Sequence, residues 1–191
     1  QRRRQRQMCI RDSLDAAQAL LEEATDCSPN AILRQALLGS VARENCDYPV
    51  SEKAYRRVIK LAVNSCYNSC EHSFGLIRCL LDKSAKSDNK QHPAFDEAQA
   101  ILLDIKQKFA HDDGVCLQAD MLGVSIAVRK GYLQHAREAC EGIYRRYLEM
   151  DSHDPLMGLD MAAAFSELNE REKAQAVLAD LAAVSYTHLR A

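Results

Sequence analysis

The densest group of potentially reactive side chains lies between residues 66 and 79. Cys66, Cys70, His72 and Cys79 offer thiolates and an imidazole, which are ligands that Zn²⁺ prefers in proteins. Their spacing, C-x3-C-x-H-x6-C, matches no common zinc module, and no second C-x2-C knuckle accompanies it. A Cys66–Cys70 disulfide would need a break between helices there. We therefore favour core and turn roles for these residues near a helix start, and we expect no metal or cofactor.

The histidines and the standard catalytic motifs give no enzyme signature. His72, His92, His111, His135 and His153 are scattered, and none has a serine or cysteine nucleophile with a supporting acid at a recognisable spacing. The sequence also lacks G-x-G-x-x-G, a phosphate loop, H-E-x-x-H and G-x-S-x-G. We expect that this segment itself is not catalytic.

Two short basic-aromatic stretches could contact RNA. They are YRR at residues 55–57 and YRRY at residues 144–147. At helical spacing the tyrosines fall near an apolar stripe and the arginines fall outside it. We therefore favour packed tyrosines beside solvated arginines, and no nucleic-acid partner.

The elements that would position these residues are helices. Glycine and proline are few, good helix formers are common, and strand-type alternation is rare. Apolar stripes at i+3, i+4 and i+7 follow five leading alanines, namely Ala17, Ala54, Ala98, Ala136 and Ala174. These alanines are 37, 44, 38 and 38 residues apart, and a polar loop insertion near residues 83–93 accounts for the long interval. Such spacing is typical of stacked helical repeats.

Further helices are expected between these stripes. They cover residues 29–43 with Ser28 as N-cap, residues 69–81, residues 115–129 after a turn at residues 112–114, and residues 155–168 with Asp154 as N-cap. Short breaks at residues 130–131 and 169–170 favour antiparallel neighbours. The sequence thus predicts an all-α fold in which a leading helix precedes four antiparallel helix pairs, stacked as an alpha-solenoid. No apolar run is long enough to span a membrane.

The two ends of the chain are expected to be translated sequencing adapter. Residues 8–13 (MCIRDS) can be encoded as ATG TGT ATA AGA GAC AGN, whose reverse complement can encode AVSYTH, the sequence of residues 183–188. This inverted repeat resembles the transposase mosaic end used in library preparation. We therefore expect a helical-repeat domain at residues 14–183, with residues 1–13 and 184–191 derived from adapter, as in a metagenomic bacterial fragment. The alternative is a genuine basic amino-terminal tail.

Setting the ends aside changes the charge balance. Of the 25 basic and 27 acidic side chains, six arginines and one aspartate lie in these ends, so the remainder carries a net charge of about −7. An acidic balance of this kind does not provide the positive charge that binding to nucleic-acid phosphates requires. Seven cysteines remain, an odd number that cannot all pair within the chain, and we interpret most as core thiols.

The last two helix pairs resemble tetratricopeptide repeats. Residues 131–136 (GYLQHA) are similar to the G-x-Y-x-x-A turn of that family. In the final pair, Ala162, Phe165 and Ala174 match its small residue, its aromatic residue and its second-helix alanine, whereas Val124 and Ala127 fill the first two places of the pair before. The family tryptophan is absent and the spacing exceeds the usual ~34 residues.

The resemblance implies a non-catalytic scaffold for protein–protein interaction. In tetratricopeptide repeats the first helix of each pair lines a groove for a peptide or partner helix. This would place Gln118, Ser125 and Arg129 on the groove. The equivalent residues of the last pair, Leu156, Leu159 and Ala163, are apolar, which suggests that a further helix covers them. The partner would be another protein, a peptide, or the remainder of this chain.

A second resemblance gives the alternative function. Residues 41–63 (VARENCDYPVSEKAYRRVIKLAV) and the repeats after them are similar to the soluble carboxy-terminal tails of bacterial O-antigen polymerase- or ligase-type membrane glycosyltransferases. This resemblance implies that the chemistry would lie in other, membrane-spanning segments and that the tail would face the periplasm. Otherwise the location is cytoplasmic or unknown.

Overall fold

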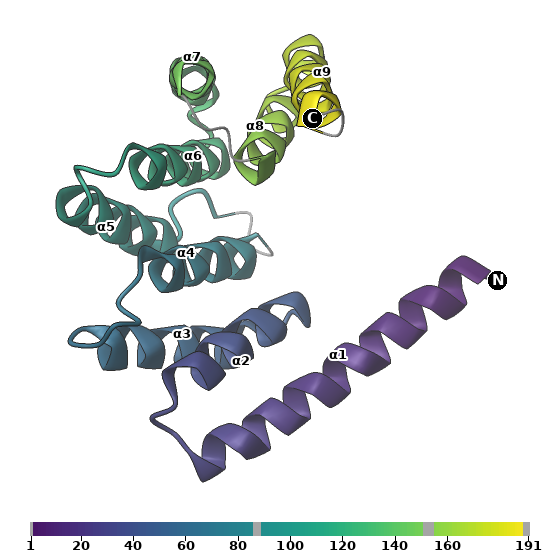
Figure 1. Ribbon diagram of the computed structural model, residues 1–191, viewed down its shortest axis with the longest axis vertical. Helices are drawn as coiled ribbons and strands as arrows, with labels where there is room; N and C mark the ends of the chain where they lie inside the picture. The colour runs from purple at the N-terminus through teal and green to yellow at the C-terminus, as the bar shows by residue number, and fades with distance from the viewer. Residues whose placement is uncertain (1, 86–88, 151–154, 189–191) are drawn as a thin grey trace. The chain divides into compact units, whose positions relative to one another are not determined.

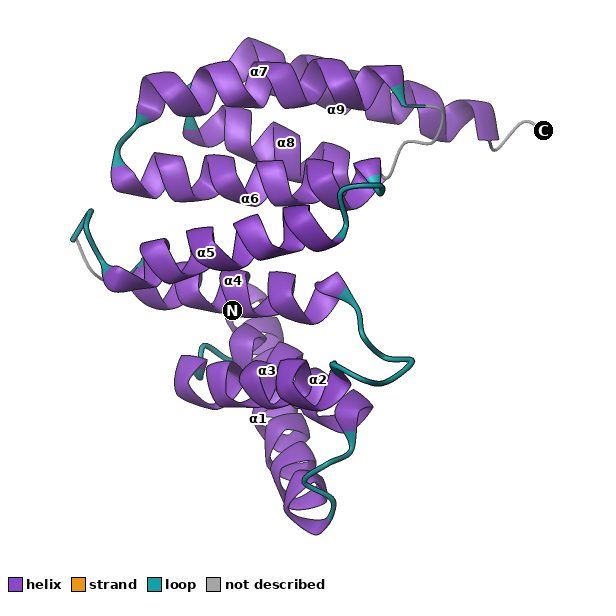
Figure 2. Cartoon of the chain, turned by 90° about the vertical axis from the view of Figure 1, so that its left-hand side faces the viewer, coloured by secondary structure: helices purple, strands orange, loops and turns teal. Residues whose placement is uncertain are grey.

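The computed structural model describes residues 2–85, 89–150 and 155–188, and the side chains of residues 12–85, 89–150 and 157–182. Over these residues the chain forms α-helices and no strand, which confirms the expected all-α class (Figures 1 and 2). The helices are α1 (Arg2–Cys27), α2 (Ile32–Glu44), α3 (Tyr48–Ala62), α4 (Cys70–Ser84), α5 (Pro93–Lys108), α6 (Asp113–Lys130), α7 (Leu133–Glu149), α8 (Pro155–Glu167) and α9 (Arg171–His188).

The chain divides into two compact units, Gln1–Ser87 and Asp88–Ala191. The first contains α1–α4 and the second contains α5–α9, so the boundary falls inside the expected loop insertion. Among the described residues, no helix is long and apolar enough to span a bilayer.

The core of the first unit is built around the ring of Tyr55. Helix α2 contacts α1, α3 and α4, and α3 also contacts α4. The Tyr55 ring, from α3, lies between Gly39 of α2 and Gly75 of α4, where an added Cβ would come within 3.1 Å and 2.4 Å of ring atoms respectively. Ser51, one turn before Tyr55, is fully buried, and its hydroxyl donates a hydrogen bond to the Gly39 carbonyl oxygen at 2.7 Å. The close approach of these helices therefore depends on the two glycines.

Helix α1 is attached to this unit largely through polar side chains. Gln18 is buried; its amide nitrogen donates to Asp47 Oδ2 at 2.8 Å, and its amide oxygen accepts from Asn45 Nδ2 at 2.8 Å. The apolar stripe expected on this helix is only partly right, since Leu20 is 67% exposed. The reason is that, among the described helices, α1 packs against α2 alone, which covers too little surface to bury the whole stripe.

The core of the second unit lies among α6, α7, α8 and α9. Helix α6 contacts α5, α7 and α8, while α8 contacts α7 and α9. Phe165, Met161, Val124, Cys140 and Val177 are almost fully buried here. The alanines expected to lead the stripes of α5, α7 and α9, namely Ala98, Ala136 and Ala174, are buried too.

Three helix-to-helix turns share one geometry. Cys46, Gly131 and Asn169 have φ values of 60°, 85° and 62°, and each follows the first helix of a pair. At each turn the next residue's N–H donates to the carbonyl oxygen five residues earlier, as in a Schellman motif (Asp47 to Ala42, Tyr132 to Ala127, Glu170 to Phe165). In each pair, the residue five positions after the left-handed residue is buried. These buried residues are Ser51, Ala136 and Ala174. In the first pair, Ser51 occupies the position equivalent to Ala136 and Ala174, while Ala54, the expected leading alanine, is buried as well.

The expected helix starts need two corrections. Helix α2 begins at Ile32, not at Pro29, because the Ala31 N–H donates to the Ser28 carbonyl oxygen at 3.1 Å and closes a separate turn; Ser28 is therefore not the N-cap. Helix α6 begins at Asp113, inside the expected turn, because the Asp112 carboxylate caps it by accepting from the Val115 N–H. The expected cap at Asp154 lies outside the described residues.

A candidate binding groove on α5, α6 and α7

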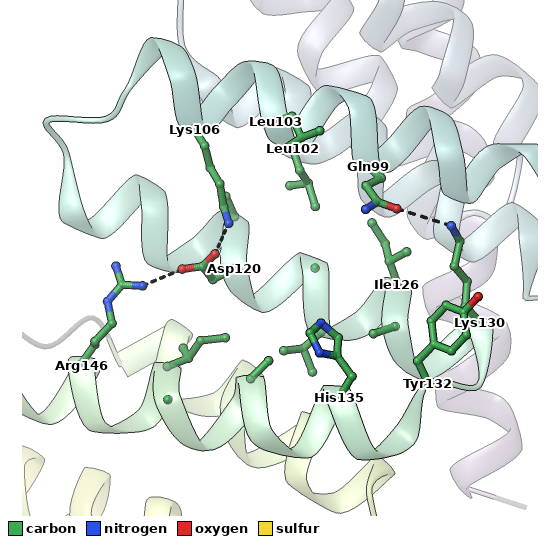
Figure 3. A pocket seen from close by; sticks show the side chains of 17 residues that line it. Gln99, Leu102, Leu103, Lys106, Asp120, Ile126, Lys130, Tyr132, His135 and Arg146 are labelled. Atoms are coloured by element: carbon green, nitrogen blue, oxygen red, sulfur yellow. Dashed lines mark hydrogen bonds and ion pairs between the residues drawn. The ribbon is translucent and has the colours of Figure 1, made fainter.

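An open groove runs along α6 in the second unit. Helices α5 and α7 each pack against α6, but along their described residues these two walls do not pack against each other. The space between them is a cavity of about 680 Å³ (Figure 3). That volume lies within the range of ligand-binding clefts. We call this space the α5–α7 groove.

Small and apolar residues form the floor and one wall of the groove. Ala119, Gly123 and Ala127 line it from α6, and Ala139 and Gly142 line it from α7. A Cβ added at Gly123 or at Gly142 would meet nothing within 4 Å. Neither glycine is therefore required by helix packing, in contrast to Gly39 and Gly75 in the first unit.

A charged bridge crosses one end of the groove. The Asp120 carboxylate on α6 accepts from Arg146 Nη1 of α7 at 2.7 Å and from the Lys106 ammonium of α5 (Figure 3). At least two-fifths of each cationic side chain remains exposed. Three helices are thus tied together by one carboxylate that holds two cations.

The other end of the groove carries Lys130 from the end of α6. Its ammonium donates to Asp96 Oδ1 at 2.7 Å and to Gln99 Oε1 at 3.4 Å, both on α5. Tyr132 and His135 line the same part of the cavity (Figure 3) and are exposed. Along the helix axis, Asp120 and Lys130 are about 15 Å apart.

The three residues that the tetratricopeptide resemblance assigns to a partner groove lie elsewhere on α6. Gln118, Ser125 and Arg129 share one face, and the helical rotation of about 100° per residue puts this face opposite Asp120 and Gly123. All three side chains are half-buried. Gln118 lines a smaller cavity of about 300 Å³, and the Ser125 hydroxyl donates to the Met121 carbonyl oxygen at 3.4 Å. None of them lines the α5–α7 groove.

The corresponding residues of the last pair are only partly described. Leu159 and Ala163 are exposed on α8, whereas the side chain of Leu156 lies outside the described residues.

The weak metal candidates are placed in different surroundings. Cys66 is exposed before α4, Cys70 is buried at the first position of α4, and His72 is half-buried. Cys79 is buried, and its thiol donates to the Tyr48 carbonyl oxygen at 3.5 Å. In the part of the chain whose side chains are described, no three His, Cys, Asp or Glu residues are grouped as metal ligands.

The basic-aromatic stretches consist of packed rings and outward-facing arginines. Tyr55 and Tyr147 are buried. Arg56 pairs with Glu52 at 2.9 Å and Arg57 donates to Asn30 at 2.6 Å. Arg146 differs because it reaches into the α5–α7 groove, a role that its position in the sequence alone did not indicate.

The first unit repeats the groove arrangement. Over the described residues, helices α1 and α3 both pack against α2 but not against each other, and a cavity of about 670 Å³ lies between them. Its charged lining residues are the cations Lys53, Arg56, Arg57 and Lys60 and the anions Glu22 and Asp26.

Comparisons with protein-family models, with curated proteins and with solved structures gave no match to this chain.

Proposed function

We propose that this chain is a non-catalytic, tetratricopeptide-like helical-repeat scaffold that binds a protein or peptide partner in the α5–α7 groove. The observation that carries the proposal is the open cavity over α6, whose floor and wall include two helical glycines with empty space where a side chain would be. A groove of this shape accepts a chain segment, because apolar floor residues lie between polar ends.

The energetic cost of the glycines supports this role. A glycine inside a helix destabilises it by about 0.5–1 kcal/mol relative to alanine. Gly123 and Gly142 both lie inside helices, and packing explains neither. Positions at which a sequence departs from local preference without a structural gain are candidates for function. An open groove that admits a partner's side chains is the gain we assign to them.

The test fills the groove without disturbing the fold. Gly123→Met places a flexible side chain in the cavity, and Ala100→Met places the same side chain on the exposed face of α5, outside the lining. The full chain is used to select binders from a display library of random peptides about twelve residues long. We expect the enriched peptides to bind the wild type and Ala100→Met alike and to lose binding to Gly123→Met. Equal binding to all three proteins, or no enrichment, would refute the proposal.

A further inference from the structure

The charge of the α5–α7 groove contrasts with the charge of the chain around it. Residues 14–183 carry more acidic than basic side chains, yet among the described residues the groove is lined by Lys106, Lys130 and Arg146 with Asp120 as the single carboxylate. Lys130 is already paired with Asp96 beside the lining, so the surplus of positive charge lies at the end where Lys106 and Arg146 share Asp120.

The cations remain able to bind a further carboxylate. A guanidinium has five N–H donors, and the bond to Asp120 comes from Nη1 of Arg146, whose side chain is 47% exposed. The Lys106 side chain is 41% exposed while it pairs with the same carboxylate. One carboxylate thus holds two exposed cations, and a second carboxylate at this end would complete the charge balance.

The groove of the first unit is also lined by more cations than carboxylates. Four cations and two carboxylates line the cavity between α1 and α3, and one of these cations, Arg56, already pairs with Glu52 outside the lining. Two separate grooves of similar volume, each lined by more cations than anions, point to a common property of whatever binds there.

We infer that the partner bound in the α5–α7 groove is an acidic peptide segment with an apolar centre. This inference rests on the proposed function and specifies its ligand. Carboxylates of the segment pair with Lys106 and Arg146 at the Asp120 end of the groove. Toward the other end, where Lys130 is already paired with Asp96, apolar side chains cover Gly123 and Leu103, which is 57% exposed. The distance of about 15 Å between the two ends corresponds to about ten residues of helix or four to five of extended chain.

Charge complementarity in such a groove would be sensitive to salt and to single charges. Because the cations are partly exposed, each pair contributes little, about 0.4–1 kcal/mol, which is a two- to fivefold change in affinity. Raising the ionic strength from about 0.05 M to 0.3 M shortens the screening length and weakens the complex further.

The experiment characterises the peptides enriched from the random library. Their net charge is compared with that of the unselected library, and their affinity for the full chain is measured by fluorescence anisotropy. Each peptide is tested beside a version in which Asp and Glu are replaced by Asn and Gln. Lys106→Gln removes a groove cation, and Lys108→Gln removes an exposed cation of the same helix that is not part of the lining.

We expect the enriched peptides to be acidic and to bind more weakly as amides, at higher salt, and to Lys106→Gln by about two- to fivefold, with Lys108→Gln unchanged. Peptides that Gly123→Met blocks but that carry no acidic excess would overturn this inference and leave the proposed function standing. Peptides indifferent to Gly123→Met, or the absence of any enriched peptide, would overturn both. Equal weakening by Lys106→Gln and Lys108→Gln would also refute it, because the effect would then be general electrostatics.

Discussion

Replacing Gly75 by alanine should destabilise the first unit by overpacking the Tyr55 ring. The added Cβ would lie 2.4 Å from Tyr55 Cε1, 2.5 Å from Cζ and 2.9 Å from the hydroxyl oxygen. Ordinary contacts between carbon atoms are about 3.5–4.0 Å, so the ring or a helix must move by about 1 Å. The ring cannot move away from the new methyl group, because its other edge lies close to the backbone of α2. A Cβ built at Gly39 would be only 3.1 Å from ring atoms.

The size of the effect follows from two opposing contributions. Overpacking a core costs about 1–3 kcal/mol, and the contact here is short and confined on both sides, which favours the upper part of that range. Replacing a helical glycine by alanine stabilises the helix by up to about 1 kcal/mol. The net destabilisation is therefore about 2 kcal/mol. For a unit of this size, that lowers the melting temperature by about 8–16 °C.

The measurement must report on the first unit alone, since the chain has two units. Hydrogen exchange of peptides from α2, α3 and α4, followed by mass spectrometry, gives the opening free energy of this unit as denaturant is added. Gly142→Ala serves as the control, because its Cβ meets nothing within 4 Å. This control should stabilise the second unit by about 0.5–1 kcal/mol.

A second substitution identifies the cause. In the Gly75→Ala background, Tyr55→Leu removes the ring that the new methyl group meets, so the two substitutions together should cost less than the sum of their separate effects. Unchanged or increased protection of α2–α4 in Gly75→Ala would refute the packing account. Strict additivity of the two substitutions would show that the methyl group does not act through Tyr55.

Three other outcomes are expected. Ala174→Glu places a charge at a buried position between α8 and α9 and should unfold that pair, whereas an unchanged thermal melt would contradict the register. Burial raises the pKa of Cys79 and raises that of Cys140 to about 11, so both thiols stay protonated at pH 8; iodoacetamide should label exposed Cys27, Cys46 and Cys66 first, and equal labelling would contradict this burial. Residues 14–183 alone should keep α1 protected against hydrogen exchange, because Asp15 and Gln18 are the first of the described side chains of α1 that bond to the turn between α2 and α3. Loss of that protection would show that residues 1–13 or 184–191 stabilise the fold.

The helices could be predicted because their signal is local. The 3.6-residue period in the sequence identifies which side of a helix becomes buried, and Ala98, Ala136 and Ala174 are buried as that period indicates. The breaks at Gly131 and Asn169 were visible as well, because a residue in the left-handed region favours glycine or asparagine. At Cys46 the same turn occurs without such a residue, and the equivalent buried position is the polar Ser51, which a stripe led by alanine does not identify.

The α5–α7 groove could not be predicted from the sequence, because it exists only where two helices pack against a third and not against each other. Leu20 fits an apolar stripe, but it stays exposed since only one of the described helices covers α1. Lys106, Asp120 and Arg146 are far apart in the chain, and only the placement of α5 and α7 on opposite sides of α6 brings them together. The sequence does contain one indication of the groove: Gly123 and Gly142 interrupt strongly helical segments, where glycine is unfavourable.

Two faces of α6 can now be compared as partner sites, and a pair of substitutions separates them. The face implied by the tetratricopeptide resemblance carries Arg129 and Ser125, whose side chains are half-buried within the fold. The opposite face carries Gly123 under an open cavity. The α5–α7 groove of about 680 Å³ offers more space than the cavity of about 300 Å³ that Gln118 lines on the opposite face. We therefore expect Gly123→Met to abolish binding of the selected peptides and Arg129→Ala to leave it unchanged, as measured by anisotropy. The reverse result would move the binding site to the face that the resemblance assigns.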